Sequence, residues 1–314
     1  MVEFAYFLSS EEHGPRALLE QAKRAEEAGF RGVHISDHFH PWTAEQGQSP
    51  FVWSVIGAIA AQTRLKVTTA VTCPTFRVHP AVIAQAAATS QLLLEGRFVL
   101  GIGSGENLNE HILGQHWPET DVRLEMLHEA VEVMRNLWDG GLTSHHGKHY
   151  TVENAQIFSL PDEPPPILMS GFGEKSIALA AEIADGFIST SPQGLEDYQK
   201  AGGKGPSAGG TKVCWAQTEK EAVDVAHRLW AVEQLPGQLN QEIALPSQFG
   251  AATQLVTKET VAENVACGPD PERHVEQIKK FVDAGYDEVY LGQMGYDQEG
   301  FFRFWEKELA PRLA

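Results

Sequence analysis

The chain has few cysteines and no long apolar run. Its three cysteines, Cys73, Cys214 and Cys267, are odd in number, widely spaced and without a CxxC pair. This usage argues against a disulfide framework or a zinc site and is typical of the reducing cytosol. No stretch of about 18 apolar residues occurs, and the N-terminus lacks the basic and apolar regions of a secretion signal. We therefore expect a cytoplasmic protein with no membrane partner.

Basic residues are also scarce, because 24 Lys and Arg stand against 42 Asp and Glu, a formal net charge of −18. A surface of this charge makes nucleic acid and anionic membranes poor partners, so we expect a small-molecule substrate. The charge itself is typical of a soluble protein. Any anionic ligand must be met by local basic groups or by helix N-termini.

The signatures GxSxG, Walker loop and HExxH are absent from the sequence. The run His145-His146-Gly147-Lys148-His149 looks like a metal cluster, but it has no carboxylate or thiolate partner at ligand spacing. We interpret it as a solvated loop before a strand-like stretch, Tyr150-Thr151-Val152, and expect no metal.

What the 314 residues do contain is a long alternation of strand-like and helix-like segments. Strands are predicted at 3–8, 32–36, 65–73, 97–103, 167–170, 187–190, 212–217 and 288–292. Helices are predicted at 14–29, 52–62, 80–93, 124–138, 175–184, a segment ending at Trp230, 272–284 and 301–309, the last ending before Pro311. Eight strands alternating with helices favour one α/β domain, 1–314, closed into a (β/α)8 TIM barrel. An open doubly wound sheet is the alternative.

Two connections are too long for simple loops, 140–166 and 231–271, and the second has helical patterns of its own. Long insertions in barrels usually cover the mouth or form an interface. We therefore expect insertions at the C-terminal mouth. The glycine-rich run 202–206 is predicted to be a flexible loop after the sixth strand.

The most informative stretch is Ser36-Asp37-His38-Phe39-His40-Pro41-Trp42, which follows the apolar segment 32–35. It therefore lies at the C-terminal end of a strand, where such barrels build active sites. Asp37 could hold a ring nitrogen or orient an imidazole, His38 could act as a base near neutral pH, and Trp42 could cover a cationic or planar intermediate. The alternative is a hydrogen-bonded structural turn with a buried tryptophan.

A second candidate is Glu106, which follows Gly101-Ile102-Gly103-Ser104-Gly105. The glycines let the backbone approach a flat ligand closely or turn sharply. The GxGxG spacing, with no long helix directly after it, is not a dinucleotide fingerprint. A lone glutamate at a strand end is more often a loop carboxylate. Two acid–base groups at the ends of different strands of one barrel, however, indicate an active site.

Two further strand ends carry weaker signals. The stretch 68–72 could be a plain core strand of β-branched residues. Met169-Ser170-Gly171-Phe172-Gly173 lies between the fifth strand and its helix. Exposed amides at such a helix N-terminus suit a phosphate, although an ordinary strand-to-helix turn would have the same sequence.

Together these motifs resemble the luciferase-like superfamily, and within it the coenzyme F420-dependent branch around the F420-dependent glucose-6-phosphate dehydrogenases. The resemblance runs nearly end to end and is carried by SDHFHPW, TTAVTCPTFRVHPAVIAQAAAT, GIGSGENLNEH and DAGYDEVYLGQMGYDQEGFFRFWEKELAPRL. It implies a (β/α)8 barrel that binds the deazaflavin of F420 at its C-terminal mouth, usually in a homodimer. It also implies a non-prolyl cis peptide bond between Ala70 and Val71.

The resemblance implies roles for individual residues as well. His38 would remove the substrate hydroxyl proton while hydride moves to ring carbon C5, Glu106 would supply a proton at N1, and Trp42 would stabilise the intermediate. The residues expected to contact F420 are Asp37, Ala70, Val71, Ser104, Glu106, Asn109, Met169, Ser170 and Gly171. A deazaflavin carries hydride and does not activate oxygen, so the protein need only position and protonate.

The chain departs from the sugar-phosphate dehydrogenase pattern where a phosphate would bind. After the sixth strand that family has a lysine that helps to clamp the phosphate, whereas the matching segment here gives Gln193. The segment 261–265 also lacks the expected basic residue. Four other cations could compensate: Lys200, Lys204, Lys258 and Arg273. Losing a charge-assisted clamp weakens phosphate recognition.

We therefore expect an F420-dependent oxidoreductase acting on an alcohol-type carbon, with a sugar 6-phosphate as one candidate substrate. Three alternatives stay open at this point. They are an FMN-dependent monooxygenase, an F420H2-dependent reductase running the reverse reaction, and a flavin- or deazaflavin-binding protein without turnover.

Overall fold

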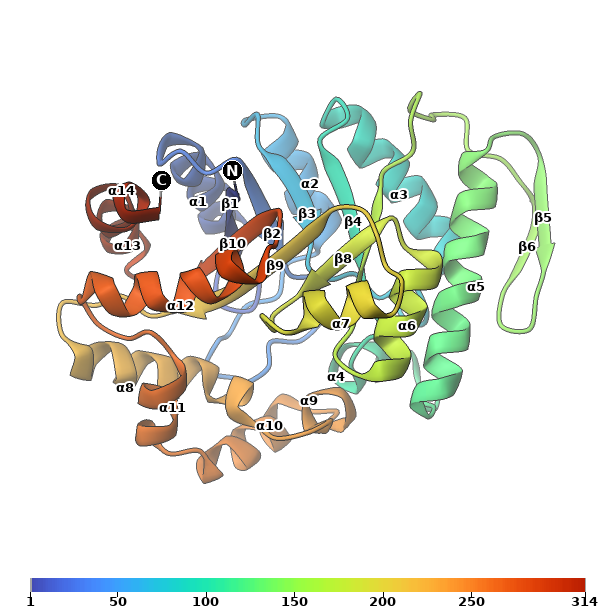
Figure 1. Cartoon of the computed structure of the whole chain (residues 1–314). Helices are drawn as coiled ribbons and strands as arrows, with labels where there is room; N and C mark the ends of the chain where they lie inside the picture. The colour runs from blue at the N-terminus through green and yellow to red at the C-terminus, as the bar shows by residue number, and fades with distance from the viewer. Residues whose placement is uncertain (1, 314) are drawn as a thin grey trace.

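Eight parallel strands close into a barrel in the order β1-β10-β9-β8-β7-β4-β3-β2 (Figure 1). The computed structural model describes residues 2–313. The barrel strands are β1 (Glu3–Leu8), β2 (Gly32–Ile35), β3 (Lys66–Thr69), β4 (Phe98–Ile102), β7 (Ile167–Ser170), β8 (Gly186–Ser189), β9 (Ser207–Val213) and β10 (Glu288–Gln293). Each strand pairs with the barrel strands before and after it in the chain, which is the topology of the predicted (β/α)8 barrel.

Helices separate consecutive barrel strands and cover the outside of the barrel. They are α1 (Pro15–Glu27), α2 (Val52–Ala60), α3 (Pro80–Leu93), α5 (Thr120–Trp138), α6 (Glu174–Ile183), α7 (Gly194–Lys200), α8 (Glu219–Trp230) and α12 (Pro271–Ala284), with α13 (Gln298–Phe304) after the last strand. Proline opens α1, α3 and α12, where its missing N–H has no partner to lose. Among residues 2–313, no helix combines the length and apolarity needed to cross a lipid bilayer.

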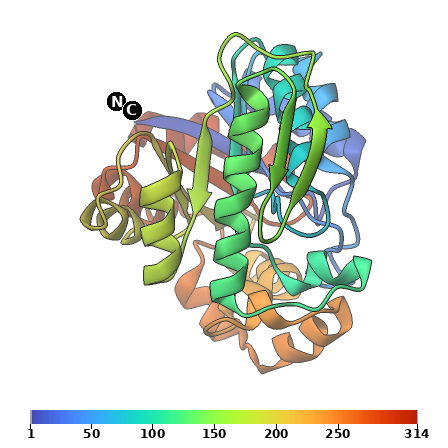
Figure 2. The ribbon, with the colours of Figure 1, turned by 90° about the vertical axis from the view of Figure 1, so that its right-hand side faces the viewer.

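The second predicted insertion lies over the C-terminal mouth, and the first does not. After α8 come the turn η2 (Ala231–Gln234), α9 (Leu239–Glu242), α10 (Pro246–Ala252), the turn η3 (Thr253–Leu255) and α11 (Lys258–Asn264), at the bottom of Figure 1. Their apolar residues form a separate cluster that contains Trp230 and Phe249 and packs against Trp42. The first insertion instead forms a hairpin beside α5 on the outside of the barrel (Figure 2).

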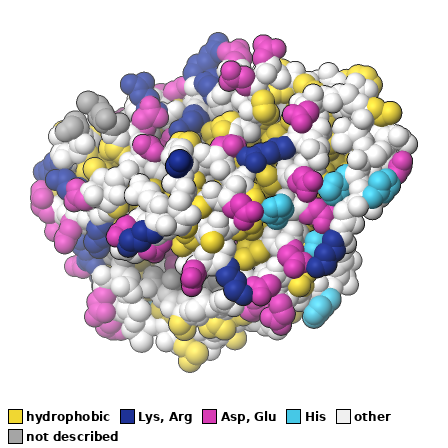
Figure 3. All heavy atoms as spheres, turned by 45° about the vertical axis from the view of Figure 1, so that its right-hand side comes forward, with side chains coloured by type: hydrophobic (Ala, Val, Ile, Leu, Met, Phe, Trp, Pro, Cys, Tyr) yellow, Lys and Arg dark blue, Asp and Glu magenta, His cyan; other side chains and the backbone are white. Residues whose placement is uncertain are grey.

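This hairpin, β5 (Thr143–His146) and β6 (Thr151–Ala155), corrects the prediction of a solvated loop at the histidine run. The carboxylate of Glu129 on α5 accepts the N–H groups of His149 and Tyr150, at 3.0 and 2.8 Å, and lies 3.1 Å from His145 Nε2. One carboxylate therefore fixes the hairpin to α5. Figure 3 shows histidines gathered on this side of the molecule. Within residues 2–313 no group of three or more His, Cys, Asp or Glu is placed to hold a metal.

Strand β9 was predicted at 212–217 but begins at Ser207, because two of its residues are glycines that weaken a strand pattern. Both positions require glycine because neighbouring aromatic rings leave no room for a Cβ atom. A Cβ on Gly210 would lie 2.3 Å from Tyr290, and one on Gly209 would lie 2.7 Å from Tyr286. The helix before it, α7, was not predicted either. At the C-terminus, helical structure continues past the predicted end through α14 (Ala310–Leu313), since Pro311 occupies its first turn.

The N-terminal end of the barrel contains a buried ionic cluster. His34 Nε2 lies 2.6 Å from Glu288 Oε1, Lys66 Nζ pairs with the other oxygen of Glu288, and the ring of Tyr290 stacks on His34 with centroids 4.3 Å apart. Burial alone would raise the pKa of Glu288. The hydrogen bond with His34 and the charges of His34 and Lys66 outweigh burial and lower this pKa to about 2.

Candidate active site

His38 follows β2 at the C-terminal end of the barrel, and its side chain is buried. Its Nδ1 lies 3.1 Å from the carbonyl oxygen of His40. A carbonyl only accepts, so in the neutral ring Nδ1 carries the hydrogen and Nε2 keeps a lone pair. Nε2 lies 3.5 Å from Glu11 Oε1, too far for a good hydrogen bond but close enough for charge attraction. The imidazole can therefore take a proton at Nε2, and Glu11 would stabilise the resulting imidazolium.

Glu11 was not predicted from the sequence as a site residue. It lies just after β1, is buried, and its Oε2 accepts a hydrogen bond from Ser36 Oγ at 2.7 Å. Ser36 Oγ accepts in turn from the N–H of Ser10 at 2.9 Å, so the ends of β1 and β2 hold the carboxylate together. The available signal was its position, because Glu11 follows the first strand as Asp37 follows the second.

The indole of Trp42 covers His38, with ring centroids 4.9 Å apart and ring planes inclined by 60°. The backbone N–H of Trp42 donates to Gln46 Oε1, and Gln46 Nε2 donates to the carbonyl of Leu229 in α8, both at 2.9 Å. Phe249 of α10 packs edge-on against the indole at 5.2 Å. The insertion over the mouth therefore fixes the aromatic cover of His38.

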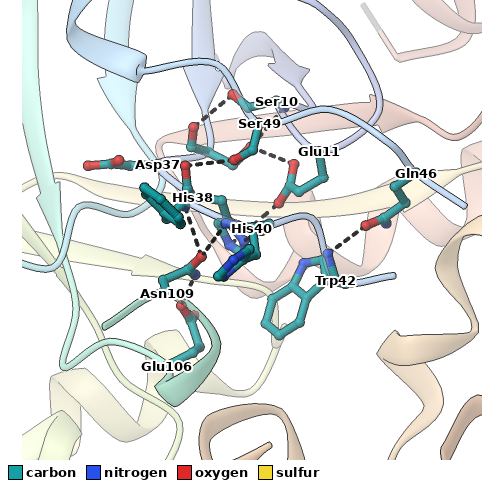
Figure 4. Close-up of polar contacts among 12 residues, drawn as sticks. Ser10, Glu11, Asp37, His38, His40, Trp42, Gln46, Ser49, Glu106 and Asn109 are labelled. Carbon is teal, nitrogen blue, oxygen red and sulfur yellow. Dashed lines mark hydrogen bonds and ion pairs between the residues drawn. The ribbon is translucent and has the colours of Figure 1, made fainter. Parts of the chain in front are cut away.

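Asn109 connects the two predicted motifs, as Figure 4 shows. It is buried in α4 (Asn107–Glu110), the short helix that follows Glu106. Its Oδ1 accepts the backbone N–H groups of Phe39 and His40 at 2.9 and 3.2 Å, and its Nδ2 donates to Glu106 Oε2 at 3.1 Å. One buried amide thus holds the loop that carries His38 beside the carboxylate of Glu106.

The carboxylate of Asp37 is fully engaged with protein groups. Its Oδ1 lies 2.7 Å from Arg77 Nη2, and its Oδ2 accepts from Thr72 Oγ1 at 2.8 Å. Arg77 Nε also lies 3.7 Å from Glu110 Oε1, and Glu110 Oε2 accepts the backbone N–H of Arg77 at 2.8 Å. This buried cluster was not predicted. It holds the loop after β3 against the loop after β2, and both oxygens of Asp37 have partners within the protein.

Between these groups the mouth presents a partly open apolar floor. Ala70 and Val71, joined by the expected cis peptide bond, are half-buried and pack on the aromatic and aliphatic residues that fill the barrel. Ser104 and Ser170 are half-buried at neighbouring strand ends, whereas Met169 and Gly171 are buried beneath the surface. The predicted contact residues therefore follow or end strands at one end of the barrel, where both apolar and hydroxyl side chains are half-buried.

Gly101 in β4 and Gly103 just after it let this strand lie close to the end of β3. A Cβ on Gly101 would lie 1.9 Å from the carbonyl oxygen of Thr69, and one on Gly103 would lie 2.7 Å from Val71 Cγ2. Only glycine permits β4 to lie this close to the end of β3. These residues shape the floor of the mouth from below.

The helix N-terminus predicted to suit a phosphate already uses two of its amides. The N–H groups of Phe172 and Gly173 both donate to Ser176 Oγ, at 3.2 and 3.1 Å. Ser176 lies in the first turn of α6, so the contact organises the turn itself.

Three of the four cations considered as replacements for the phosphate clamp are paired with carboxylates. Lys200 pairs with Glu196, Lys258 with Asp224 and Arg273 with Glu219. The fourth, Lys204, lies in the loop before β9 and therefore at the N-terminal end of the barrel. Gln193 Nε2 donates to Glu196 at 2.6 Å.

Comparison with known proteins agrees with this architecture. Residues 2–288 match the family described as luciferase-like monooxygenase. The F420-dependent glucose-6-phosphate dehydrogenases of Microbacterium testaceum and Nocardia farcinica are 35% and 36% identical to this chain. Each alignment covers 99% of this chain and 97% or 98% of the relative.

Solved structures give the same result. An F420-dependent secondary alcohol dehydrogenase in complex with an F420–acetone adduct has a TM-score of 0.90 and 30% identity, with 98% of both chains covered. The coenzyme F420-dependent tetrahydromethanopterin reductase of Methanopyrus kandleri, with a TM-score of 0.74 and 20% identity over 100% of this chain and 99% of its own, shares the fold. With a family match across the barrel and relatives of this identity along its whole length, the chain belongs to the luciferase-like monooxygenase family.

Proposed function

We propose that this protein is an F420-dependent oxidoreductase that transfers hydride between an alcohol carbon and the deazaflavin. The observation that carries the proposal is the Asn109 bridge, which joins the loop of the base His38 to the carboxylate of Glu106 at one barrel mouth. Relatives named as F420-dependent dehydrogenases, and a similar structure that holds an F420–acetone adduct, support the same cofactor and the same class of carbon.

The mouth suits a flat ring with polar edges. Ala70 and Val71 offer apolar surface to its face, and Ser104, Ser170 and Glu106 offer polar groups at its edge. With Asp37, Asn109, Met169 and Gly171, these residues would hold the deazaflavin. When bound, F420 supplies a hydride acceptor that does not activate oxygen.

The residues around this surface divide the proton chemistry between them. His38 takes the substrate hydroxyl proton at Nε2, and Nδ1–H, donated to the His40 carbonyl, fixes the orientation of the ring. Glu11 stabilises the charge that His38 then carries. Trp42 covers the imidazole and excludes water from it. Glu106, oriented by Asn109, holds the proton needed at ring nitrogen N1.

Fluorescence titration with F420 followed by a screen of alcohols tests this function. We expect binding at low-micromolar concentrations or below, and alcohol-dependent loss of the oxidised F420 absorbance. The variants His38→Ala and Glu106→Ala should lose turnover. His128→Ala, which removes an exposed histidine from α5, should retain it. Failure of the wild-type protein to bind F420 would overturn the proposal.

Two other reactions fit the same site and have separate assays. A reductase would oxidise reduced F420 when supplied with a carbonyl or alkene compound. An FMN-dependent monooxygenase, favoured by the family description, would consume oxygen in the presence of reduced FMN. Oxygen uptake under these conditions, without F420-dependent turnover, would replace the proposed function by this second one.

We also infer a homodimer and a cytoplasmic location. Four apolar side chains remain exposed on or beside the adjoining helices α2 and α3, namely Phe51, Val82, Leu92 and Leu93, and a second copy could cover them. The three cysteines are buried free thiols, which suits a reducing compartment. Light scattering measures the first inference, and cell fractionation measures the second.

A further inference from the structure

Lys212 places a cation at the mouth of the barrel. It pairs with Gly292 in the register of β9 and β10, and its ammonium nitrogen lies 4.9 Å from the centroid of the Phe7 ring. Phe7 belongs to the cluster that fills the barrel, so the lysine side chain extends along the inner surface toward the C-terminal end. The ammonium also lies 4.1 Å from the centroid of the Trp230 ring. A cation in this place would be suited to an anionic substrate.

The ammonium is already neutralised by Glu233, at 2.6 Å between Nζ and Oε1. Glu233 belongs to η2, the turn that begins the insertion over the mouth. The lysine side chain is 16% exposed and the glutamate side chain 33%, so water screens the pair less than it screens a surface pair. An anion that binds Lys212 must first displace this carboxylate.

The guanidinium groups near the mouth are also paired with carboxylates. Arg77 is paired with Asp37 and approaches Glu110, and Arg123 lies 3.3 Å from Glu242 and 4.5 Å from the centroid of the Trp117 ring. Gln193, in the loop after β8, brings no charge to this end of the barrel and donates to Glu196. The basic groups that could meet a phosphate are therefore occupied or absent at the sites described.

The remaining surroundings of Lys212 favour an uncharged molecule. Trp42, Trp230 and Phe249 belong to one aromatic wall, formed where the insertion packs on the loop after β2. Glu11 and Glu12, which follow β1, are also buried beside this mouth. Aromatic rings attract apolar surface, and the carboxylate of Glu11 would repel a phosphate dianion.

We propose that the substrate is an uncharged alcohol and that Glu233 excludes phosphorylated alcohols by holding Lys212. This rests on the proposed function and narrows its substrate class. In the oxidation the C–H bond breaks and its electron pair leaves with the hydrogen to F420. The hydroxyl proton goes to His38, and a carbonyl forms on the substrate. No step of this balance requires a phosphate.

Inorganic phosphate, titrated calorimetrically into the F420-loaded protein, tests the role of Glu233. We expect the wild type to bind phosphate at least about 10-fold more weakly than Glu233→Gln, because this variant frees a charge-assisted donor. The double variant Glu233→Gln/Lys212→Met should lose the gain. Glu20→Gln, which makes the same change of charge beside Lys23 on the exposed face of α1, should show none.

A turnover comparison of glucose with glucose 6-phosphate, alongside simple secondary alcohols, completes the test. Faster wild-type turnover with glucose 6-phosphate than with every uncharged alcohol overturns the inference. Equal phosphate affinity in the wild type and Glu233→Gln overturns it too, as does a gain that survives in the double variant. The phosphate titrations are repeated without F420, so their result stands if the separate F420 titration overturns the proposed function.

Discussion

The two ends of the barrel each contain a histidine from the β2 region beside a buried glutamate, and the two pairs differ in distance and in cover. At the N-terminal end His34 lies 2.6 Å from Glu288, while at the mouth His38 lies 3.5 Å from Glu11. The first pair is completed by Lys66 and stacked under Tyr290. The second lies under the half-buried Trp42.

This difference separates a pair that stabilises the fold from a pair that is free to react. In the His34–Glu288 pair the two side chains are bonded to each other, and Glu288 is also paired with Lys66. A proton transfer there would break these existing interactions. In the His38–Glu11 pair, Nε2 of His38 keeps a lone pair that can accept a proton. The carboxylate of Glu11 lies close enough to stabilise the charge that results. Buried carboxylates outside the His38 pair also differ between the two ends, since the pKa of Glu288 falls to about 2 whereas that of Glu12, the residue after Glu11, rises to about 7.

The largest effect should come from removing the histidine at the mouth. For His38→Ala we expect alcohol-dependent reduction of F420 to slow by about 10³-fold, the range of a lost general base. The free energy of unfolding should fall less than for loss of the histidine at the other end, because His38 makes one hydrogen bond to a backbone carbonyl and no close contact with a carboxylate. Steady-state kinetics and urea unfolding measure the two quantities. Turnover of the variant within a few-fold of the wild type would contradict the assignment of His38 as the base.

The matched change at the other end should reverse this pattern. His34→Ala removes a fully buried ring that is bonded to Glu288 and stacked on Tyr290. We expect a loss of about 3 kcal/mol in the free energy of unfolding, as for other broken buried pairs, with turnover of the folded protein within about 3-fold. A loss of activity at full stability would contradict the assignment of this pair to the fold.

Glu288 should make the stability of the protein depend on acid. Its folded pKa of about 2 lies below the ordinary value of 4.5, so its contribution is complete above about pH 4.5 and is lost as the pH falls toward 2. By linkage this contribution is about 3 kcal/mol. The gap in unfolding free energy between wild type and Glu288→Gln should therefore narrow between pH 6 and pH 3. A constant gap would show that the charge does not matter.

Glu12 should make the free energy of unfolding depend on pH in the opposite direction to Glu288, and by a smaller amount. Burial raises its pKa above 4.5 to about 7, although Gly295 N–H donates to it at 3.0 Å. The folded state therefore holds the proton more strongly, and stability decreases as the pH rises from about 4.5 to 7. We expect Glu12→Gln to be about 1 to 2 kcal/mol more stable than the wild type at pH 8. At pH 4 thermal unfolding should detect little difference, and an equal gain at both pH values would contradict the shift.

Much of the fold follows from periodic patterns in the sequence. The bounds of β1, α3 and β7 match their predicted ranges because apolar residues and an initial proline mark them clearly. The start of β9 could not be found in this way. Its glycines are explained only by Tyr286 and Tyr290, which lie about eighty residues further along the chain.

The candidate site likewise contains residues that a local sequence pattern marks and residues that it does not. His38, Trp42 and Glu106 follow predicted strands, and that position indicated them. Glu11 and Arg77 act through partners on other strands, so no local pattern marks their contacts. The bridging role of Asn109 likewise depends on two loops meeting, which requires the closed barrel.

The attachment of Trp42 to the insertion has a consequence for the order of events. Gln46 joins the Trp42 loop to the end of α8, and Phe249 of α10 rests on the indole. Any displacement of α10 and the end of α8 would therefore also move the indole and expose the imidazole to solvent. Hydrogen exchange should report residues 42–46 and the end of α8 opening as one unit.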